Sequence, residues 1–148
     1  MTGKVTSGGL AVLGLVGLHV GLWATLAPRS FYDDFPGGGR AWVAADGPYN
    51  EHLVRDFGAL NLALTAVVTM ALVTRTPAVI RAAALAWLVY SVPHLVYHAR
   101  HLGVYDTSDK ILNLAALGGA VVLSAAVLGR ELIMDPGANP PTDPPPSD

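Results

Sequence analysis

The chain alternates between four long apolar stretches and shorter segments in which its polar and charged residues gather. The apolar stretches cover about residues 8–27, 52–73, 78–101 and 109–128. Each is close to the roughly 20 residues that an α-helix needs to cross the hydrocarbon core of a bilayer. The pattern therefore predicts an all-α fold in which residues 1–134 form an integral membrane four-helix bundle.

Two segments fall outside this pattern. Residues 29–50, between the first and second helices, combine five aromatic residues with the flexible turn Gly37-Gly38-Gly39. Aromatic side chains favour the membrane–water boundary, so we expect an extracytoplasmic loop folded back over the end of the bundle. A plain connector without a role in binding is the other interpretation. Residues 135–148 hold six of the 11 prolines, which predicts a disordered, extended tail.

Composition supports the membrane interpretation. Hydrophobic residues make up 52% of the chain and charged residues only 14%, against about 25% charged residues in soluble domains. The formal net charge of −2 leaves no basic face, which argues against nucleic acid as a partner. The absence of cysteine excludes disulfides, thiolate metal sites and cysteine nucleophiles. We expect a multi-pass protein of the cell membrane that contacts the lipid bilayer.

The orientation follows from the short link between the second and third spans. Arg75-Thr76-Pro77 carries a positive charge and no acid. Lys and Arg are enriched in cytoplasmic loops, so this link is predicted to be cytoplasmic. With four spans, both termini then lie on the cytoplasmic side.

Small residues on two of the spans predict close helix packing. Gly17 and Gly21 form a Gly-x-x-x-Gly pair in the first span, and Ala115, Gly118 and Gly119 lie in the fourth. Such spacing lets helix backbones approach closely in lipid. These faces either pack inside the bundle or bind another chain, a second copy or another membrane-protein subunit.

Ionisable residues gather at one end of the four spans. The chain has five histidines, and helix geometry places all of them in the half of the membrane where the second span begins and the third ends. Residues four apart in a helix lie on the same face. Three polar pairs have this spacing: His52 with Asp56, His94 with His98, and Asp109 with Asn113. Polar faces avoid lipid, so we expect them to converge inside the bundle.

One interpretation of this cluster is a metal site. Imidazole and carboxylate ligands together suit copper, zinc or iron. The candidate ligands are His94, His98, Asp56 and His52, with Glu51, His101 and Asp109 as further candidates. Elemental analysis of the pure protein would test this interpretation.

Three alternatives remain open. Two histidines on different helices would hold a haem as axial ligands. A histidine chain with acidic partners would conduct protons or other ions, or would line a pocket for a small polar ligand. A satisfied polar network would be purely structural, with Arg55 paired to Glu51 or Asp56, and Arg100 paired to Asp106 or Asp109. Further members of that network are Asn61, Asn113 and His19.

No motif for nucleophilic catalysis, phosphate binding or zinc proteolysis occurs in the chain. The sequence therefore identifies no catalytic residue. We expect a binding or accessory subunit of a larger membrane complex, with a metal- or haem-dependent enzyme or metal-handling protein, or a proton or ion conductor, as alternatives.

Two segments carry a resemblance to a known group. Arg55-Asp56-Phe57-Gly58-Ala59-Leu60-Asn61-Leu62 and Val92-Pro93-His94-Leu95-Val96-Tyr97-His98 make the chain similar to small four-span bacterial membrane proteins of the DoxX-like group. The resemblance implies four spans and a place in respiratory or thiol-related membrane complexes. Because this chain has no cysteine, a thiol-oxidation role does not fit it. Seven arginines against two lysines are typical of an actinobacterial-type genome.

Overall fold

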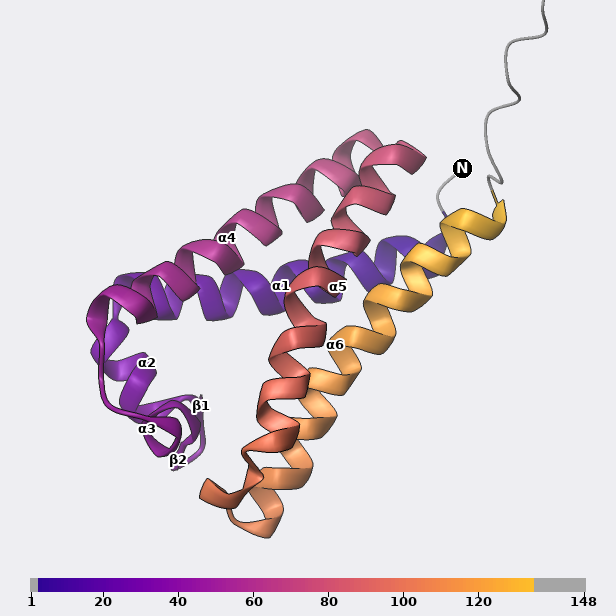
Figure 1. The fold of residues 1–148 in the computed structure, drawn as a ribbon. Helices are drawn as coiled ribbons and strands as arrows, with labels where there is room; N and C mark the ends of the chain where they lie inside the picture. The colour runs from indigo at the N-terminus through magenta and orange to yellow at the C-terminus, as the bar shows by residue number, and fades with distance from the viewer. Residues whose placement is uncertain (1–2, 135–148) are drawn as a thin grey trace, which may run out of the picture.

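The computed structural model describes residues 3–134 (Figure 1). The predicted tail, residues 135–148, lies outside the described residues. The elements in chain order are α1 (Lys4–Leu26), α2 (Pro28–Asp34), β1 (Pro36–Gly37), β2 (Arg40–Ala41), α3 (Trp42–Asp46), α4 (Glu51–Thr74), α5 (Pro77–Arg100), the 3₁₀ turn η1 (Leu102–Val104) and α6 (Thr107–Met134).

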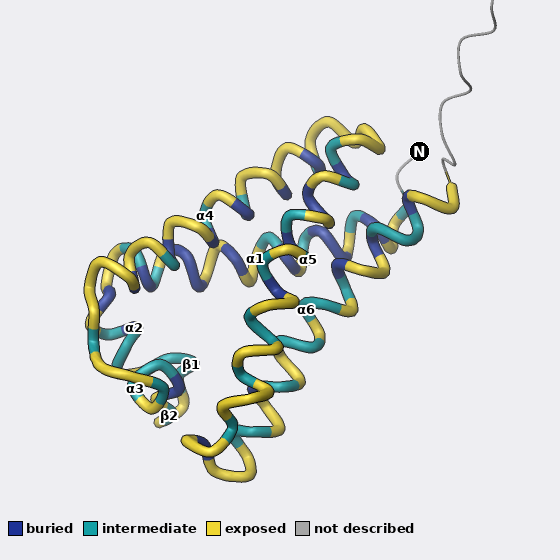
Figure 2. The backbone as a smooth tube through the Cα atoms, in the orientation of Figure 1, coloured by how far each residue is buried: buried dark blue, intermediate teal, exposed yellow. Residues whose placement is uncertain are grey.

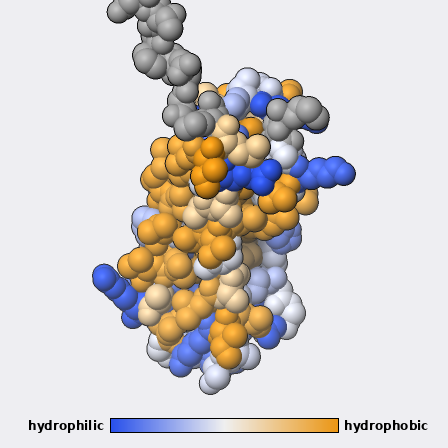
Figure 3. Space-filling view, turned by 90° about the vertical axis from the view of Figure 1, so that its right-hand side faces the viewer, coloured by the Kyte–Doolittle hydropathy of each residue, from blue (hydrophilic) through white to orange (hydrophobic). Residues whose placement is uncertain are grey.

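The helices confirm the all-α prediction. Within residues 3–134, α1, α4, α5 and α6 are each long and apolar enough to cross a membrane. On the face drawn in Figure 3, apolar residues form a broad band, and hydrophilic residues gather toward the two ends. This distribution matches a molecule surrounded by lipid at its middle and by water at its ends.

The ends of the long helices follow from local chemistry. Asn50 caps α4, because its side chain accepts a hydrogen bond from the backbone N–H of Leu53 at 3.1 Å. Asp106 caps α6 in the same way, accepting from the N–H of Asp109 at 2.8 Å. This bond and one from Ser108 hold the pKa of the Asp106 carboxyl below its usual value. Between α4 and α5, Arg75 takes a left-handed conformation and Pro77 starts the next helix.

Two ends of helices differ from the sequence estimate. α1 begins at Lys4, and α6 continues past residue 128 to Met134. The continuation of α6 buries Glu131 against α1, where its Oε1 accepts a hydrogen bond from the Thr6 hydroxyl at 3.1 Å. A charged residue near a span's end thus extends the helix when a neighbouring helix supplies a hydrogen-bond donor.

The four long helices are arranged as two pairs. α1 packs mainly along α4, and α5 packs mainly along α6. In Figure 1 the pairs meet where α1 begins and α6 ends, and they diverge toward the opposite end. Figure 2 shows the same arrangement by burial, with the dark blue stretches where helices face one another.

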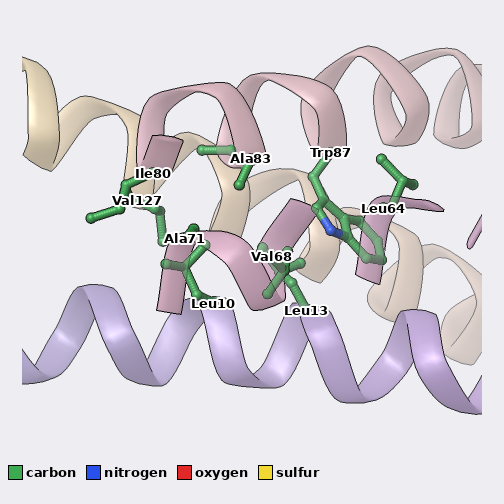
Figure 4. Close-up of a cluster of buried hydrophobic side chains, with 10 residues drawn as sticks. Leu10, Leu13, Leu64, Val68, Ala71, Ile80, Ala83, Trp87 and Val127 are labelled. Atoms are coloured by element: carbon green, nitrogen blue, oxygen red, sulfur yellow. The ribbon is translucent and has the colours of Figure 1, made fainter. Parts of the chain in front are cut away.

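The main core lies where the pairs meet. All four long helices contribute to it, as the close-up in Figure 4 shows. Its buried members are Leu10, Leu13, Leu64, Val68, Ala71, Ile80, Ala83, Ala84, Trp87 and Val127. The core fills the interior in the half of the bundle near the two termini of the described chain.

Glycines bring α1 and α4 into close contact. A Cβ atom at Gly21 would lie 2.8 Å from the Leu62 side chain, and one at Gly17 would lie 2.6 Å from the Thr65 hydroxyl. The Gly-x-x-x-Gly pair therefore packs inside the bundle. The α6 glycines differ, since a Cβ at Gly118 or Gly119 would meet nothing within 4 Å.

The segment between α1 and α4 is folded rather than a simple connector. β1 and β2 form a short antiparallel hairpin with Pro36 opposite Ala41, and the three glycines of its turn all have positive φ. A second, smaller cluster of buried residues joins this segment to the diverging ends of α1 and α4. We call residues 28–46 the loop segment.

Candidate functional site

A cavity of about 360 Å³ lies between the two diverging helix pairs, and the loop segment forms part of its wall. We call this cavity the chamber. Its wall is mainly apolar and aromatic, and every helix of the described chain from α1 to α6 contributes to it. The aromatic members are Phe31, Phe35, Trp42, Phe57, Trp87 and Tyr90.

Two of the predicted site histidines, His94 and His98, line the chamber. The His94 ring stacks with Phe57 and Tyr90, at centroid separations of 5.9 Å and 5.4 Å. The His94 and His98 rings are 4.8 Å apart, as expected for residues four apart on one helix. α5 thus presents an imidazole pair to the chamber, as the helical spacing predicts.

Tyr105 connects this histidine pair to the loop segment. Its hydroxyl donates to the backbone carbonyl of Trp42 at 3.1 Å and lies 3.4 Å from Nδ1 of His98. Burial, together with the nearby charge of Asp46, raises the pKa of Tyr105 to about 12. The hydroxyl therefore stays protonated and able to donate.

Three residues of the chamber wall carry buried polar atoms without a hydrogen-bond partner in the described part of the chain. These atoms are Oδ1 of Asn113 and the indole nitrogens of Trp42 and Trp87. Each such atom costs about 1–3 kcal/mol when it stays unpaired. Asn61 differs, because its amide donates to the carbonyl of Phe57 at 2.9 Å.

The other predicted metal ligands lie elsewhere. His52 and Asp56 form an exposed pair at 3.2 Å, with side chains 87% and 61% accessible. Arg55 binds Glu51 at 2.9 Å, one of its two predicted partners, and also donates to the carbonyl of Thr25. The structure therefore does not bring the charged start of α4 to the chamber.

The two remaining histidines are also exposed. His101 stacks on Tyr97 at 4.2 Å, and its Nδ1 lies 2.7 Å from the carbonyl of Tyr97. His19 lies edge-on to Trp23 of its own helix at 5.6 Å. Neither residue lines the chamber.

The predicted metal site gains no support from these positions. Within residues 3–134, no group of three or more histidine, aspartate or glutamate side chains is placed to hold a metal ion. The predicted haem needs two histidines on different helices, whereas both chamber histidines come from α5.

Asp109 holds the loop segment instead of pairing with Arg100. Its carboxylate lies 2.6 Å from Nε of Arg40 in β2, and its side chain is only 16% accessible. With the Tyr105–Trp42 hydrogen bond, this ion pair joins the loop segment to the start of α6. The loop segment therefore bridges the gap between the two helix pairs.

Replacing Asp109 with asparagine is expected to loosen the loop segment, because the amide keeps the size of the carboxylate but not its charge. Backbone amides of residues 36–46 should then exchange with solvent several-fold faster in hydrogen-exchange mass spectrometry. Asp33→Asn is the matched control, since it breaks the exposed Arg29–Asp33 pair, at 2.7 Å, within α2. Unchanged exchange in Asp109→Asn would show that this ion pair does not hold the segment.

Sequence reasoning missed the contribution of the loop segment to the site. Trp42 and Asp46 line the chamber, although the sequence points only to aromatic residues near the membrane boundary. The signal was the density of aromatic residues in residues 29–50, which is more than a connector needs. Nothing local indicates which of them face the bundle.

Comparisons with protein-family models, with curated proteins and with solved structures found no match. The class of protein therefore rests on the fold and the site alone. It is an all-α chain with four helices apolar enough to cross a membrane and an aromatic chamber between two helix pairs.

Proposed function

We propose that the protein is a membrane-embedded binding protein that holds a small, largely apolar molecule in the chamber. The observation that carries this proposal is the chamber itself, about 360 Å³ in volume and walled mainly by apolar and aromatic side chains. Ligand sites in proteins have volumes of roughly 300–1,000 Å³ and the same kind of wall, with a few polar groups that orient the ligand. His94, His98, Asp46 and Asn113 are such groups here.

The polar groups of the wall are suited to orienting a bound molecule. The ionisable groups of the wall, apart from Tyr90, are two imidazoles and one carboxylate, from His94, His98 and Asp46. Tyr90 and Ser91 are the wall's hydroxyl groups, and the Ser91 hydroxyl already donates to the carbonyl of Trp87 at 2.6 Å. The imidazoles and the carboxylate can hydrogen-bond to a bound molecule and orient it without any bond being broken.

The packing of the bundle also favours binding over conduction. The main core lies between the chamber and the end of the bundle where α1 begins. It fills the interior there with apolar side chains such as Leu10, Leu13 and Ile80. Protons and ions need a chain of polar groups or water to cross the membrane. A chamber that ends at an apolar core suits a bound ligand better than it suits a path for protons or ions.

For the predicted role as an accessory subunit, we place the partner surface on α6. This helix has the smallest buried share of the four long helices. Ala115, Gly119 and Ala126 are exposed along it, and a Cβ at Gly119 would meet nothing within 4 Å. Small exposed residues at helical spacing favour close approach of another transmembrane helix, from a second copy or another subunit.

The orientation and the family stay predictions. α1 begins and α6 ends at the same end of the bundle, as the Thr6–Glu131 hydrogen bond requires. The basic link at Arg75 favours placing that end in the cytoplasm and the loop segment outside it. The DoxX-like resemblance of the residues around Asp56 and His94 agrees with this arrangement of spans.

Replacing Ala116 with phenylalanine is expected to weaken ligand binding roughly tenfold or more, because Ala116 lines the chamber and the added ring would occupy it. The probe is ω-bromodecanol, whose terminal bromine quenches tryptophan fluorescence in proteoliposomes. Trp42 and Trp87 line the chamber and report on binding there.

The neighbouring substitution Ala115→Phe is the matched control. Both alanines are exposed, but Ala115 does not line the chamber, so its added ring would lie outside the cavity. Saturable quenching is expected in the wild type and in Ala115→Phe at similar probe concentrations, whereas Ala116→Phe should need roughly tenfold more probe or should show no saturation. Equal quenching in all three proteins would mean that the probe enters lipid only, and the proposed function would fail.

A further inference from the structure

Building on the proposed binding function, we infer that the chamber's ligand is a lipophilic organic cation. Such a molecule carries an ammonium or related positively charged group on an apolar body. Its charged group would lie beside Asp46 at the loop-segment end of the chamber, and its apolar body would lie against the deeper wall near Trp87.

The wall of the chamber is unbalanced in charge. Among the described side chains that line it, Asp46 is the one acid, and none is lysine or arginine. The wall therefore offers a negative charge to a ligand and offers an anionic ligand no fixed positive charge.

Asp46 has no salt-bridge partner within residues 3–134. The arginines of the loop segment and of the start of α4 pair with other acids: Arg40 with Asp109, Arg29 with Asp33 and Arg55 with Glu51. The charge of Asp46 acts on the phenols of Tyr97 and Tyr105 and on the imidazoles of His94 and His98. The Tyr97 hydroxyl lies within hydrogen-bonding reach of the Asp46 carboxylate, which still has no lysine or arginine partner among the described residues. A partly buried carboxylate at the edge of an apolar cavity gains most from a cation that brings its own apolar surface.

The aromatic side chains of the chamber wall favour the same ligand. Trp42 belongs to the same short helix as Asp46, and Phe35 lies edge-on to Trp42 at 6.1 Å. Both rings line the chamber, and Phe57 lines it from α4. Organic cations bind to aromatic rings through the ring quadrupole. An acid among aromatic rings selects a cation over a neutral molecule of the same shape.

The test compares three probes that share one bromodecyl chain and differ only in the head: trimethylammonium, hydroxyl and sulfonate. Tryptophan quenching by the terminal bromine is measured in proteoliposomes of zwitterionic lipid, with the full-length protein. The cation is expected to bind roughly tenfold more tightly than the alcohol, and the sulfonate more weakly than either.

Three variants separate the role of Asp46 from general effects. Asp46→Asn is expected to bring the affinity for the cation down to that for the alcohol, while the affinity for the alcohol stays unchanged. Asp46→Glu keeps the charge and should keep the preference for the cation. Asp34→Asn removes an exposed acid of the same loop segment that does not line the chamber, and should change nothing.

The outcomes distinguish this inference from the function on which it rests. If the alcohol or the sulfonate binds as tightly as the cation, or if Asp46→Asn leaves the affinity for the cation unchanged, the cation proposal is overturned but the binding function stands. If none of the probes gives saturable quenching that Ala116→Phe weakens or abolishes, the binding function itself fails.

Discussion

Replacing Trp87 with alanine is expected to lower the free energy of unfolding by about 3–5 kcal/mol, the range found for removing a buried tryptophan or phenylalanine. Trp87 is only 2% exposed and belongs to the core that all four long helices build. Its ring packs edge-on to Tyr90 at 5.8 Å, and it lies against the glycine face of α1, where a Cβ at Gly17 would be 3.1 Å from it. Removing it would leave a hole where the helix pairs meet.

The reason for this loss differs from that in a soluble protein. Lipid chains are as apolar as the core, so moving the ring from lipid into the core contributes little to the free energy of unfolding. What the variant loses is close packing, because the helices cannot collapse into the space of an indole ring. Unfolding by sodium dodecyl sulfate in mixed micelles, followed by circular dichroism, measures the loss.

A lipid-facing residue of the same helix provides the control. Leu85 is 53% exposed, and Leu85→Ala should change the free energy of unfolding by less than about 1 kcal/mol. Trp87→Phe keeps part of the ring and should lose less than Trp87→Ala, so the comparison holds even if the alanine variant does not fold. Similar losses for Leu85→Ala and Trp87→Phe would contradict the position of Trp87 in the core.

Gly58→Ala is expected to destabilise the protein by about 1–3 kcal/mol, although it adds a single methyl group. A Cβ at Gly58 would lie 2.8 Å from the backbone nitrogen of Thr25 and 3.0 Å from the Ala24 side chain. Backbone atoms cannot move aside as a flexible side chain can, so α1 and α4 would have to separate. The same unfolding assay measures this effect.

Gly119→Ala makes the same chemical change in a helix without the contact. A Cβ there would meet nothing within 4 Å, and alanine is the better helix former. The variant should therefore be as stable as the wild type or slightly more stable. If Gly58→Ala were equally harmless, the close approach of α1 and α4 at this point would be wrong.

Pairing within one helix was the part of the site that the sequence predicted best. Arg55 binds Glu51 four residues away, and His52 lies beside Asp56. His94 and His98 present adjacent rings on one face of α5. These contacts depend only on the 3.6-residue helical repeat, which holds wherever the helix forms.

Predictions that needed contacts between distant segments succeeded less well. The sequence placed Asp109 against Arg100 and in the histidine cluster, but Arg40, 69 residues away, occupies its carboxylate. The sequence analysis also expected the polar face of His52 and Asp56 to turn inward. In the structure, both side chains are exposed instead. Near a membrane surface, water solvates such a pair well enough that nothing forces it into the interior.

The amino-acid sequence by itself determined the helices and their membrane character, because helix formation and hydropathy are local properties of about 20 consecutive residues. Only the tertiary structure decided which faces meet. The chamber forms because the glycines of α1 bring α4 close to it, while the α5–α6 pair diverges from the α1–α4 pair. The loop segment then closes the gap between the two helix pairs. Asp46 enters its wall through contacts such as Tyr105–Trp42, which join residues 63 positions apart. Such contacts depend on the packing of the whole bundle, and no local pattern encodes them.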